Sequence, residues 1–496
     1  MTGVVRELHR NRRADGPPTS GAARLPDGFG IALDDSAREL EPGTWFGGVP
    51  ARITRLSDAG RRALDELRTG PVAGPTAGRL ARTLVDSGLA HPVPPAAAGP
   101  FDLTVLVPVL DRPEALGRCL AALGREHPVV VVDDGSRDAA AIARVAAAHG
   151  ARLIRRDVNG GPAAARNTGL VAVTTGFVAL LDSDCVPPAG WLAPLVAHLA
   201  DPLVAAAAPR IAAIADDTWA GRYTRVRGSL DLGPRPSRVA PKSRVSYVPT
   251  AALVARRAAL LDVAGGTGAF EASMRVGEDV DLVWRLDAAG WRVRYAPAVR
   301  VSHQEPGTWP GLLRRRFSYG TSAAPLALRH PGAGAPLVIH PWLGVTVAAL
   351  LARRPGLAAG GYAMSVAAMS RRLRTAGLPT RGTARSMAGA VRQTWLGVGR
   401  YLTQLAAPAV AAAAVLPGSR GRRLAAASLL LGPPLTSWAA HRDSLDPIRY
   451  TAAHLADEIA YGAGVWAGCR THRTIAPLRP AIARPARRRT TRGDRT

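Results

Sequence analysis

The chain has 496 residues, which is enough for two or three domains with a sizeable core. Its formal net charge is +27, with 47% apolar and only 5% aromatic residues. The arginines are spread along the chain without aromatic interleaving or zinc-ligand spacing, which argues against nucleic acid as a partner. An anionic membrane surface or a polyanionic substrate would also account for the positive charge.

The cysteines and the N-terminus suggest a reducing compartment. Cys119, Cys185 and Cys469 lie far apart in the sequence and indicate neither a disulfide framework nor a metal knuckle. Residues 1–30 lack the apolar stretch of a secretory signal. We expect residues 1–25 to form a flexible leader.

Residues 26–95 have the pattern of a small winged-helix-like unit, with short strands, two helices and a further strand. Ser57 is placed to cap the first helix, and Gly88 is placed to end the second. The proline-rich stretch over residues 93–100 indicates a linker.

A different pattern begins at residue 101 and continues to residue 330. Continuous apolar runs, typical of strands buried on both faces, alternate with segments of helical periodicity. This alternation predicts a parallel α/β sheet, in which ligands bind at the carboxyl ends of the strands. Five acidic residues follow the predicted strands: Asp111, Asp133, Asp134, Asp182 and Asp184. We therefore expect them to meet at one edge of the sheet.

Asp182 and Asp184 lie one residue apart in the segment LLDSDC. Two carboxylates so placed repel each other unless a positive group or water separates them. A metal ion, an arginine and open water are the three candidates. The pair alone is weak evidence, because a second Asp-x-Asp occurs at Asp279 and Asp281.

Three motifs in this order resemble the family 2 glycosyltransferases of GT-A fold. They are VVVVDDGSRD, GGPAAARNTG and LLDSDCVPPAGWL, and the resemblance covers residues 103–305. It implies an α/β GT-A domain that binds a nucleotide sugar. It also implies that the following residues contact the donor: Pro108, Asp111, Asp133, Asp134, Gly135, Arg166, Asp182 and Ser183. A plain turn at Asp133 and Asp134, and an ordinary amphipathic helix carrying Arg166, are the alternatives.

The same resemblance implies a divalent cation, Mn²⁺ or Mg²⁺, held by Asp182, Asp184 and His303. A hard cation of this kind neutralises the charge of a departing diphosphate, and a nitrogen ligand would favour Mn²⁺. His303 is expected just after the last strand of the sheet, and a purely structural histidine is the alternative.

The segment GEDVDLVWRL, over residues 277–286, begins a predicted helix. The resemblance makes Asp279 the catalytic base, with Glu278 beside it. Asp279 would take the proton of an acceptor hydroxyl in an inverting, single-displacement transfer. The alternative is a solvated acidic helix N-terminus, which the helix dipole also favours.

The Gln-x-x-Arg-Trp motif of processive glycan synthases is absent, and RRRFSYGTSAAPLALRHP stands in its place over residues 314–331. This segment and the N-terminal unit resemble the mycofactocin-pathway glycosyltransferases of actinobacteria. The resemblance implies transfer of a hexose, glucose from UDP-glucose, in β linkage to a small peptide-derived acceptor, premycofactocin. It also suggests that residues 26–95 recognise a peptide. A lipid or polysaccharide acceptor, and a catalytically inactive binding or scaffold protein, are the alternatives.

Residues 335–475 contain apolar stretches shorter than the roughly 20 residues of a transmembrane helix. Pro408, Pro433 and Pro434 interrupt them, and arginines flank them. We expect helices attached to the cytoplasmic side of the cell membrane, peripherally or by shallow insertion. Soluble packing helices and true spans are the alternatives. Residues 476–496 are expected to form a basic disordered tail.

Overall fold

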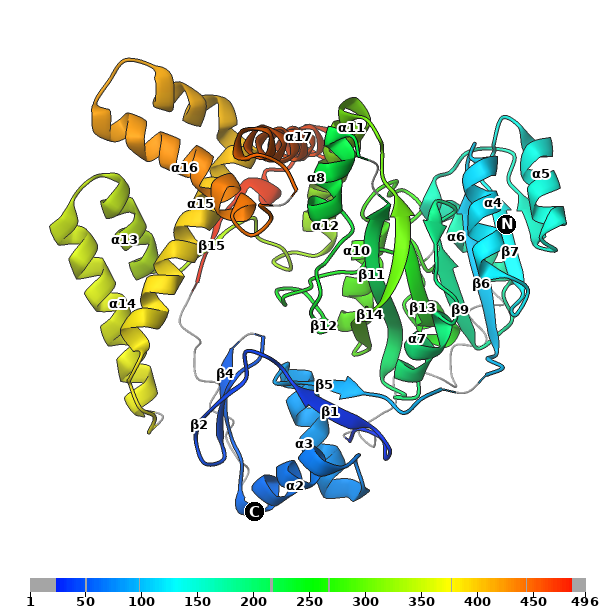
Figure 1. Cartoon of the computed structure of the whole chain (residues 1–496), viewed down its shortest axis with the longest axis horizontal. Helices are drawn as coiled ribbons and strands as arrows, with labels where there is room; N and C mark the ends of the chain where they lie inside the picture. Colours follow the sequence, from blue (N-terminus) through cyan, green and yellow to red (C-terminus); the bar gives the residue numbers. More distant parts are fainter. Residues whose placement is uncertain are drawn as a thin grey trace. The chain divides into compact units, whose positions relative to one another are not determined.

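A computed structural model describes residues 24–483, except residues 50, 98, 215–216, 266–267, 376 and 443. The predicted leader, residues 1–25, lies outside the described residues except for its last two positions. The predicted disordered tail, residues 476–496, is described over residues 476–483, which form a short 3-10 helix (Ala476–Leu478) and strand β16 (Ala481–Ile482), paired with β15 (Val338–Ile339); its remainder lies outside the described residues. The chain divides into two compact units (Figure 1). The first comprises Met1–Arg315 with Pro325–Ala333, and the second comprises Arg316–Ala324 with Gly334–Thr496.

The N-terminal part of the first unit has the predicted order of strands, two helices and a strand. Its elements are β1 (Gly30–Leu33), β2 (Arg38–Glu41), β3 (Thr44–Gly47), β4 (Arg52–Arg55), α2 (Asp58–Thr69), α3 (Gly74–Ser87) and β5 (Ala90–Val93). Ser57 caps α2 by accepting a hydrogen bond from the backbone N–H of Gly60 at 3.2 Å. Gly88 ends α3 with a φ of 73°, in the left-handed region. Phe29, Leu64 and Leu84 belong to a separate small core.

The central sheet of the first unit has the strand order β10-β14-β11-β13-β9-β6-β7-β8, with β12 beside β14. The strands are β6 (Leu103–Val109), β7 (Val129–Asp133), β8 (Arg152–Arg155), β9 (Phe177–Leu181), β10 (Cys185–Val186), β11 (Val204–Ile214), β12 (Ser237–Val239), β13 (Ala252–Arg256) and β14 (Arg292–Gln304). Strands β6 to β9 pair in parallel, as predicted. The prediction of a parallel sheet is wrong for β13, which runs antiparallel to both β9 and β11, and for the short strands β10 and β12, which run antiparallel to β14. A short apolar run fixes burial but not strand direction, so the sequence did not indicate this reversal.

Helices cover both faces of this sheet, and a core lies under each layer. One core receives α4 (Pro113–Leu123), α5 (Ala139–Ala148) and α7 (Leu192–His198). The other receives α6 (Pro162–Ala172), α9 (Arg257–Asp262) and α10 (Glu278–Ala288). Burying a leucine or valine in such a core contributes about 1.5–3 kcal/mol. This packing fixes α6 and α10 against the sheet and confirms the predicted α/β class.

The remaining helices of the chain are mostly in the second unit, where the predicted apolar, mainly helical region is confirmed. They are α8 (Trp219–Arg227), α11 (Trp309–Thr321), α12 (Ala323–Arg329), α13 (Pro341–Leu351), α14 (Pro355–Thr375), α15 (Thr383–Val415), α16 (Arg420–Trp438) and α17 (Pro447–Thr471). Helix α15 bends at Ala406, two residues before Pro408, whose ring cannot be accommodated in a straight helix. In the part of the chain that the structure describes, no helix combines the length and the apolar character needed to cross a membrane.

Candidate active site

The carboxyl ends of β6, β7 and β9 meet at one edge of the central sheet, because the three strands are parallel neighbours. Asp111 follows β6, Asp133 ends β7 opposite Val109, and Asp182 follows β9 directly. The acidic residues that the sequence places after these strands therefore share this edge, as expected.

Asp133 and Asp134 hold the loops beside β7. Asp133 is fully buried; it accepts a hydrogen bond from the backbone N–H of Ser136 at 2.9 Å and pairs with Arg155. Asp134 accepts from the backbone N–H groups of Gly160 and Gly161, at 3.1 and 2.7 Å. The carboxylates thus fix the turn to the segment that begins α6.

Gly135 is required by this turn. Its φ is +83°, and a Cβ atom there would lie 2.9 Å from the backbone nitrogen of Asn159. A side chain would therefore push the turn away from the start of α6.

Asp111, Pro108 and Ser183 differ in their access to solvent. Asp111 is exposed, and its Oδ1 accepts from the backbone N–H of Arg137 at 2.7 Å. This hydrogen bond holds the pKa of Asp111 below its ordinary value. Pro108 is half-buried and Ser183 is buried. Of the three, Asp111 presents the most accessible polar group.

Arg166 connects the end of β9 to the start of α10. It is 2% exposed and donates to Asp182 at 2.6 Å and to Glu278 at 2.8 Å. Its guanidinium also lies over the ring of Phe270, 5.6 Å from the centroid. Burial opposes the charge, but the two carboxylates outweigh it and raise the pKa of Arg166. A metal ion, an arginine and open water were the candidates for separating the charge of Asp182 from that of Asp184, and in this structure Asp182 is paired with the arginine.

Asp184 lies between an arginine and a histidine. Arg112 donates to its Oδ2 at 2.8 Å, and Nε2 of His303 lies 3.5 Å from its Oδ1. The contact with His303 arises because Cys185 of β10 pairs with His303 of β14. His303 therefore lies within β14, so the expectation that it comes after the last strand of the sheet is wrong.

Glu305 is a neighbour of His303 that our sequence analysis missed. Its Oε1 lies 3.5 Å from Nδ1 of His303. Glu305 follows directly after β14, two residues from His303, and in extended backbone residues at this spacing point to the same side, so the spacing was the available signal. Burial lowers the pKa of His303, but Glu305 and Asp184 together raise it above its ordinary value.

The arrangement around His303 fits a cation ligand in part. A histidine that binds metal through one ring nitrogen typically has a carboxylate near the other, and Glu305 lies near Nδ1 of His303 while Asp184 lies near Nε2. Within the described ranges, however, no three His, Cys, Asp or Glu side chains converge as a metal site. Asp184 and His303 are close together, whereas Asp182 is turned to Arg166. The residue types suit Mn²⁺, and Asp182 would have to leave Arg166 to join the other two.

The three acidic residues in the first turn of α10 have three different environments. Gly277 precedes the helix with a φ of 84°, and Glu278 is buried against Arg166. Asp281 is fully buried and bound by Arg285, Arg329 and His330, at 2.8, 2.7 and 2.8 Å. Asp279 is partly exposed, and in the described part of the chain no cation pairs with it.

This difference in environment appears in the pKa values. Protein atoms crowding its carboxyl group, and the charge of Glu278, raise the pKa of Asp279. Burial also raises the pKa of Glu278, although Arg166 opposes the shift. Asp281 is held below its ordinary pKa, because its hydrogen bonds to Arg329, Arg285 and His330 outweigh its burial. Of these three, Asp279 is the residue that combines solvent access with a raised pKa, as a general base requires.

The comparisons with known proteins show to which family the chain belongs. Residues 104–260 match the family described as glycosyl transferase family 2. The pre-mycofactocin glycosyltransferase of Mycobacterium tuberculosis (strain H37Rv) is 38% identical over 485 residues, which are 93% of this chain and 99% of the relative. The succinoglycan biosynthesis protein ExoU of Rhizobium meliloti is 30% identical over 41% of this chain and 64% of its own length.

Among solved structures, this chain is similar to the mannosyltransferase PcManGT from Pyrobaculum calidifontis in complex with GDP-Man and Mn²⁺. The similarity has a TM-score of 0.42 and 21% identity, over 75% of this chain and 90% of that chain. The identity over nearly the whole length of the mycobacterial relative is what shows the family. The chain belongs to glycosyltransferase family 2, together with the pre-mycofactocin glycosyltransferase of M. tuberculosis.

Proposed function

We propose that this enzyme is a metal-dependent, inverting glycosyltransferase. It moves a hexose, glucose from UDP-glucose, in β linkage onto a small peptide-derived acceptor, premycofactocin. The acceptor is supported by the name of the mycobacterial relative, which aligns over nearly its whole length. The reaction type is supported chiefly by Asp279, which is partly exposed and has no cation partner among the described residues. Asp279 lies next to Glu278 in α10, and Arg166 joins Glu278 to Asp182 at the edge of the sheet.

On the donor side, Asp182, Asp184 and His303 would hold the divalent cation. When bound, the cation neutralises the charge of the leaving diphosphate. The exposed Asp111 and the loop that Asp133 and Asp134 stabilise would receive the nucleoside. Pro108, Gly135 and Ser183 remain proposed donor contacts through their backbone and small side chains.

On the acceptor side, Asp279 takes the proton from the attacking hydroxyl. The hydroxyl oxygen forms a bond to C1 of the sugar, and the bond from C1 to the diphosphate oxygen breaks on the opposite face. The bonding electrons leave with the nucleoside diphosphate, so an α-linked donor gives a β-linked product. Glu278 supports this step through Arg166, whose position it fixes from the same helix turn.

We propose that residues 26–95 recognise the peptide part of the acceptor. The N-terminal part is joined to the rest of the first unit by a buried ion pair, in which Arg82 donates to both oxygens of Asp201 at 2.8 Å. Such a two-bond contact holds two surfaces in a defined orientation.

We also propose that the second unit binds the cytoplasmic side of the membrane peripherally. Large apolar side chains are exposed on α13, α14 and α16, among them Trp342, Leu357 and Leu424. Arginines of the same unit would bind anionic lipid headgroups. Sedimentation of the full chain with vesicles containing anionic lipid tests this: binding that falls with added salt supports it, and no binding to any vesicle contradicts it.

The acceptor and donor can be tested together. The purified enzyme is incubated with Mn²⁺, acceptor extract and each of several sugar nucleotides, and the products are analysed by mass spectrometry. We expect a hexose on a small peptide-derived molecule with UDP-glucose, and a β-anomeric signal by NMR. Sugar found instead on lipid or polysaccharide would contradict the proposed acceptor.

A further inference from the structure

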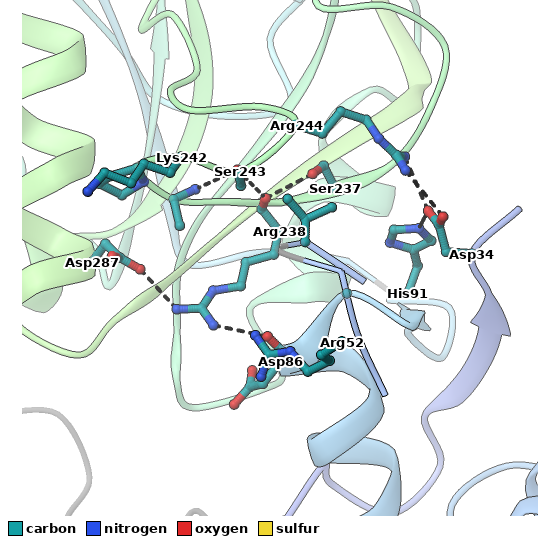
Figure 2. A pocket seen from close by; sticks show the side chains of 14 residues that line it. Asp34, Arg52, Asp86, His91, Ser237, Arg238, Lys242, Ser243, Arg244 and Asp287 are labelled. Atoms are coloured by element: carbon teal, nitrogen blue, oxygen red, sulfur yellow. Dashed lines mark hydrogen bonds and ion pairs between the residues drawn. The ribbon is translucent and has the colours of Figure 1, made fainter. Parts of the chain in front are cut away.

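The first unit contains a cavity that the proposed reaction does not use. Its volume is about 230 Å³, and Figure 2 shows the side chains that line it. One wall comes from the N-terminal part, through β4, the end of α3 and β5. The other wall comes from residues 237–244 and from the end of α10.

The acidic side chains of this cavity are already neutralised. Each is bound by an arginine: Asp34 by Arg244 at 3.1 and 3.2 Å, Asp86 by Arg292 at 3.1 and 3.0 Å, and Asp287 by Arg238 at 3.0 Å. The carboxylates therefore have little capacity left to attract a further cation.

Positive charge remains uncompensated on both walls. Arg52 of β4 and Lys242 also line the cavity, and within the residues described here neither side chain has a hydrogen bond or an ion pair. Lys242 has a φ of 65°, a conformation that residues other than glycine seldom adopt. Strained residues of this kind are concentrated at binding sites.

Arg294 is a buried arginine next to the cavity, although it is not one of the residues that line it. It is 2% exposed, and none of its three guanidinium nitrogens has a hydrogen bond to a described residue. Its nearest carboxylate oxygen, on Asp86, lies 3.9 Å away. Arg294 stands opposite Arg238 in the pairing of β12 with β14, so the two side chains share a face of the sheet. A buried guanidinium without hydrogen bonds is costly, and the negative charge of an anion in the neighbouring cavity would offset part of that cost.

We propose that this cavity binds an oxyanion, the carboxylate or phosphate group of a small molecule. Arg52 and Lys242 would donate charge-assisted hydrogen bonds, and the buried charge of Arg294 would add to the attraction. Ligand pockets for larger molecules measure roughly 300–1,000 Å³, so a cavity of about 230 Å³ suits one anionic group with a short substituent.

The cavity is lined in part by α10, the helix that carries the candidate base Asp279. Asp287 lines the cavity at the last turn of α10, and Asp279 is in the first turn, about 12 Å away along the axis at 1.5 Å per residue. A bound oxyanion would compete for Arg238, the partner of Asp287, and so act on this helix.

Calorimetric titration of the full chain, at low ionic strength and without metal or nucleotide, tests the proposal. Three probes are used: inorganic phosphate, dialanine, and dialanine amide, which lacks the carboxylate. We expect phosphate or dialanine to bind and dialanine amide not to bind. Binding of phosphate alone identifies a phosphate site, and binding of dialanine but not its amide identifies a carboxylate site.

The variant Arg52→Gln/Lys242→Gln should weaken this binding at least tenfold. The matched control is Arg55→Gln/Arg62→Gln, which removes two exposed arginines of the same N-terminal part that do not line the cavity. We expect the control to bind like the unmodified chain. The proposal is overturned if no probe binds, or if the Arg52→Gln/Lys242→Gln variant binds as tightly as the control. Arg52 belongs to the part that we propose recognises the acceptor peptide, but neither Arg52 nor Lys242 is a proposed donor, metal or base residue. The titrations contain no acceptor, metal or nucleotide, so their outcomes do not depend on whether the proposed transfer reaction is correct.

Discussion

The substitution Arg166→Met tests how strongly the candidate site depends on its buried ion pairs. It leaves Glu278 buried without a counter-charge and removes the partner of Asp182. Breaking a buried pair in this way costs about 3–5 kcal/mol, and loss of the contact with Phe270 adds roughly 0.5–2 kcal/mol. We therefore expect the first unit to lose about 4 kcal/mol or more of its free energy of unfolding at pH 8.

The loss should be smaller at pH 5. Without Arg166 the pKa of Glu278 rises further, so a larger fraction of its carboxyl groups is protonated at pH 5 than at pH 8, and less uncompensated charge is buried. Hydrogen exchange of amides in α6 and α10, measured in urea with EDTA, gives the free energy of unfolding for this unit.

Arg112→Met is the matched control, because Arg112 pairs with Asp184 but its side chain is 54% exposed. Exposed pairs contribute only about 0–1 kcal/mol. If Arg166→Met were no more destabilising than Arg112→Met at pH 8, or if its effect did not change with pH, the reasoning about this ion-pair network would be refuted.

Three further predictions concern the reaction. The value of kcat/KM should rise as pH increases through about 7, because crowding protein atoms and the charge of Glu278 raise the pKa of Asp279 to about 7 and only its ionised form accepts a proton. A kcat/KM that is flat from pH 5 to pH 8 would contradict this. Treatment with EDTA should stop turnover and Mn²⁺ should restore it, and His303→Ala should require at least tenfold more Mn²⁺ for half-maximal rate; unchanged metal dependence would exclude His303 as a ligand. Gly277 and Gly290 flank α10 with φ values of 84° and 93°, so Gly277→Ala and Gly290→Ala should each lower the free energy of unfolding by about 1–2 kcal/mol. Only Gly277→Ala should lower kcat/KM; equal activities would show that the start of α10 does not need its present geometry.

Much of the fold could be predicted because its signals are local. Ser57 and Gly88 act as the predicted caps of α2 and α3. The acidic residues after β6, β7 and β9 share an edge because parallel neighbours bring their carboxyl ends together.

The features that the sequence did not indicate depend on contacts between distant segments. Strand β13 reverses direction, which no apolar run can reveal. The pairing of Arg166 with Glu278 joins residues 112 positions apart, and Asp281 gains Arg329 and His330 from 48 and 49 positions away. The motif pattern marked the charged residues of this edge, but their partners depend on how α6, α10 and the end of α12 pack together.

The most direct test of the account is the substitution Asp279→Asn, studied by two assays on one sample. Calorimetry measures binding of UDP-glucose with Mn²⁺, and mass spectrometry measures transfer to the acceptor. Asp138→Asn is the control, because asparagine can also cap α5, where Asp138 now accepts from the backbone N–H of Ala141. We predict unchanged donor affinity in both variants and a roughly 10²–10⁴-fold slower transfer in Asp279→Asn alone, the usual contribution of a general base. Transfer by Asp279→Asn at a rate within tenfold of the control would contradict the proposed mechanism.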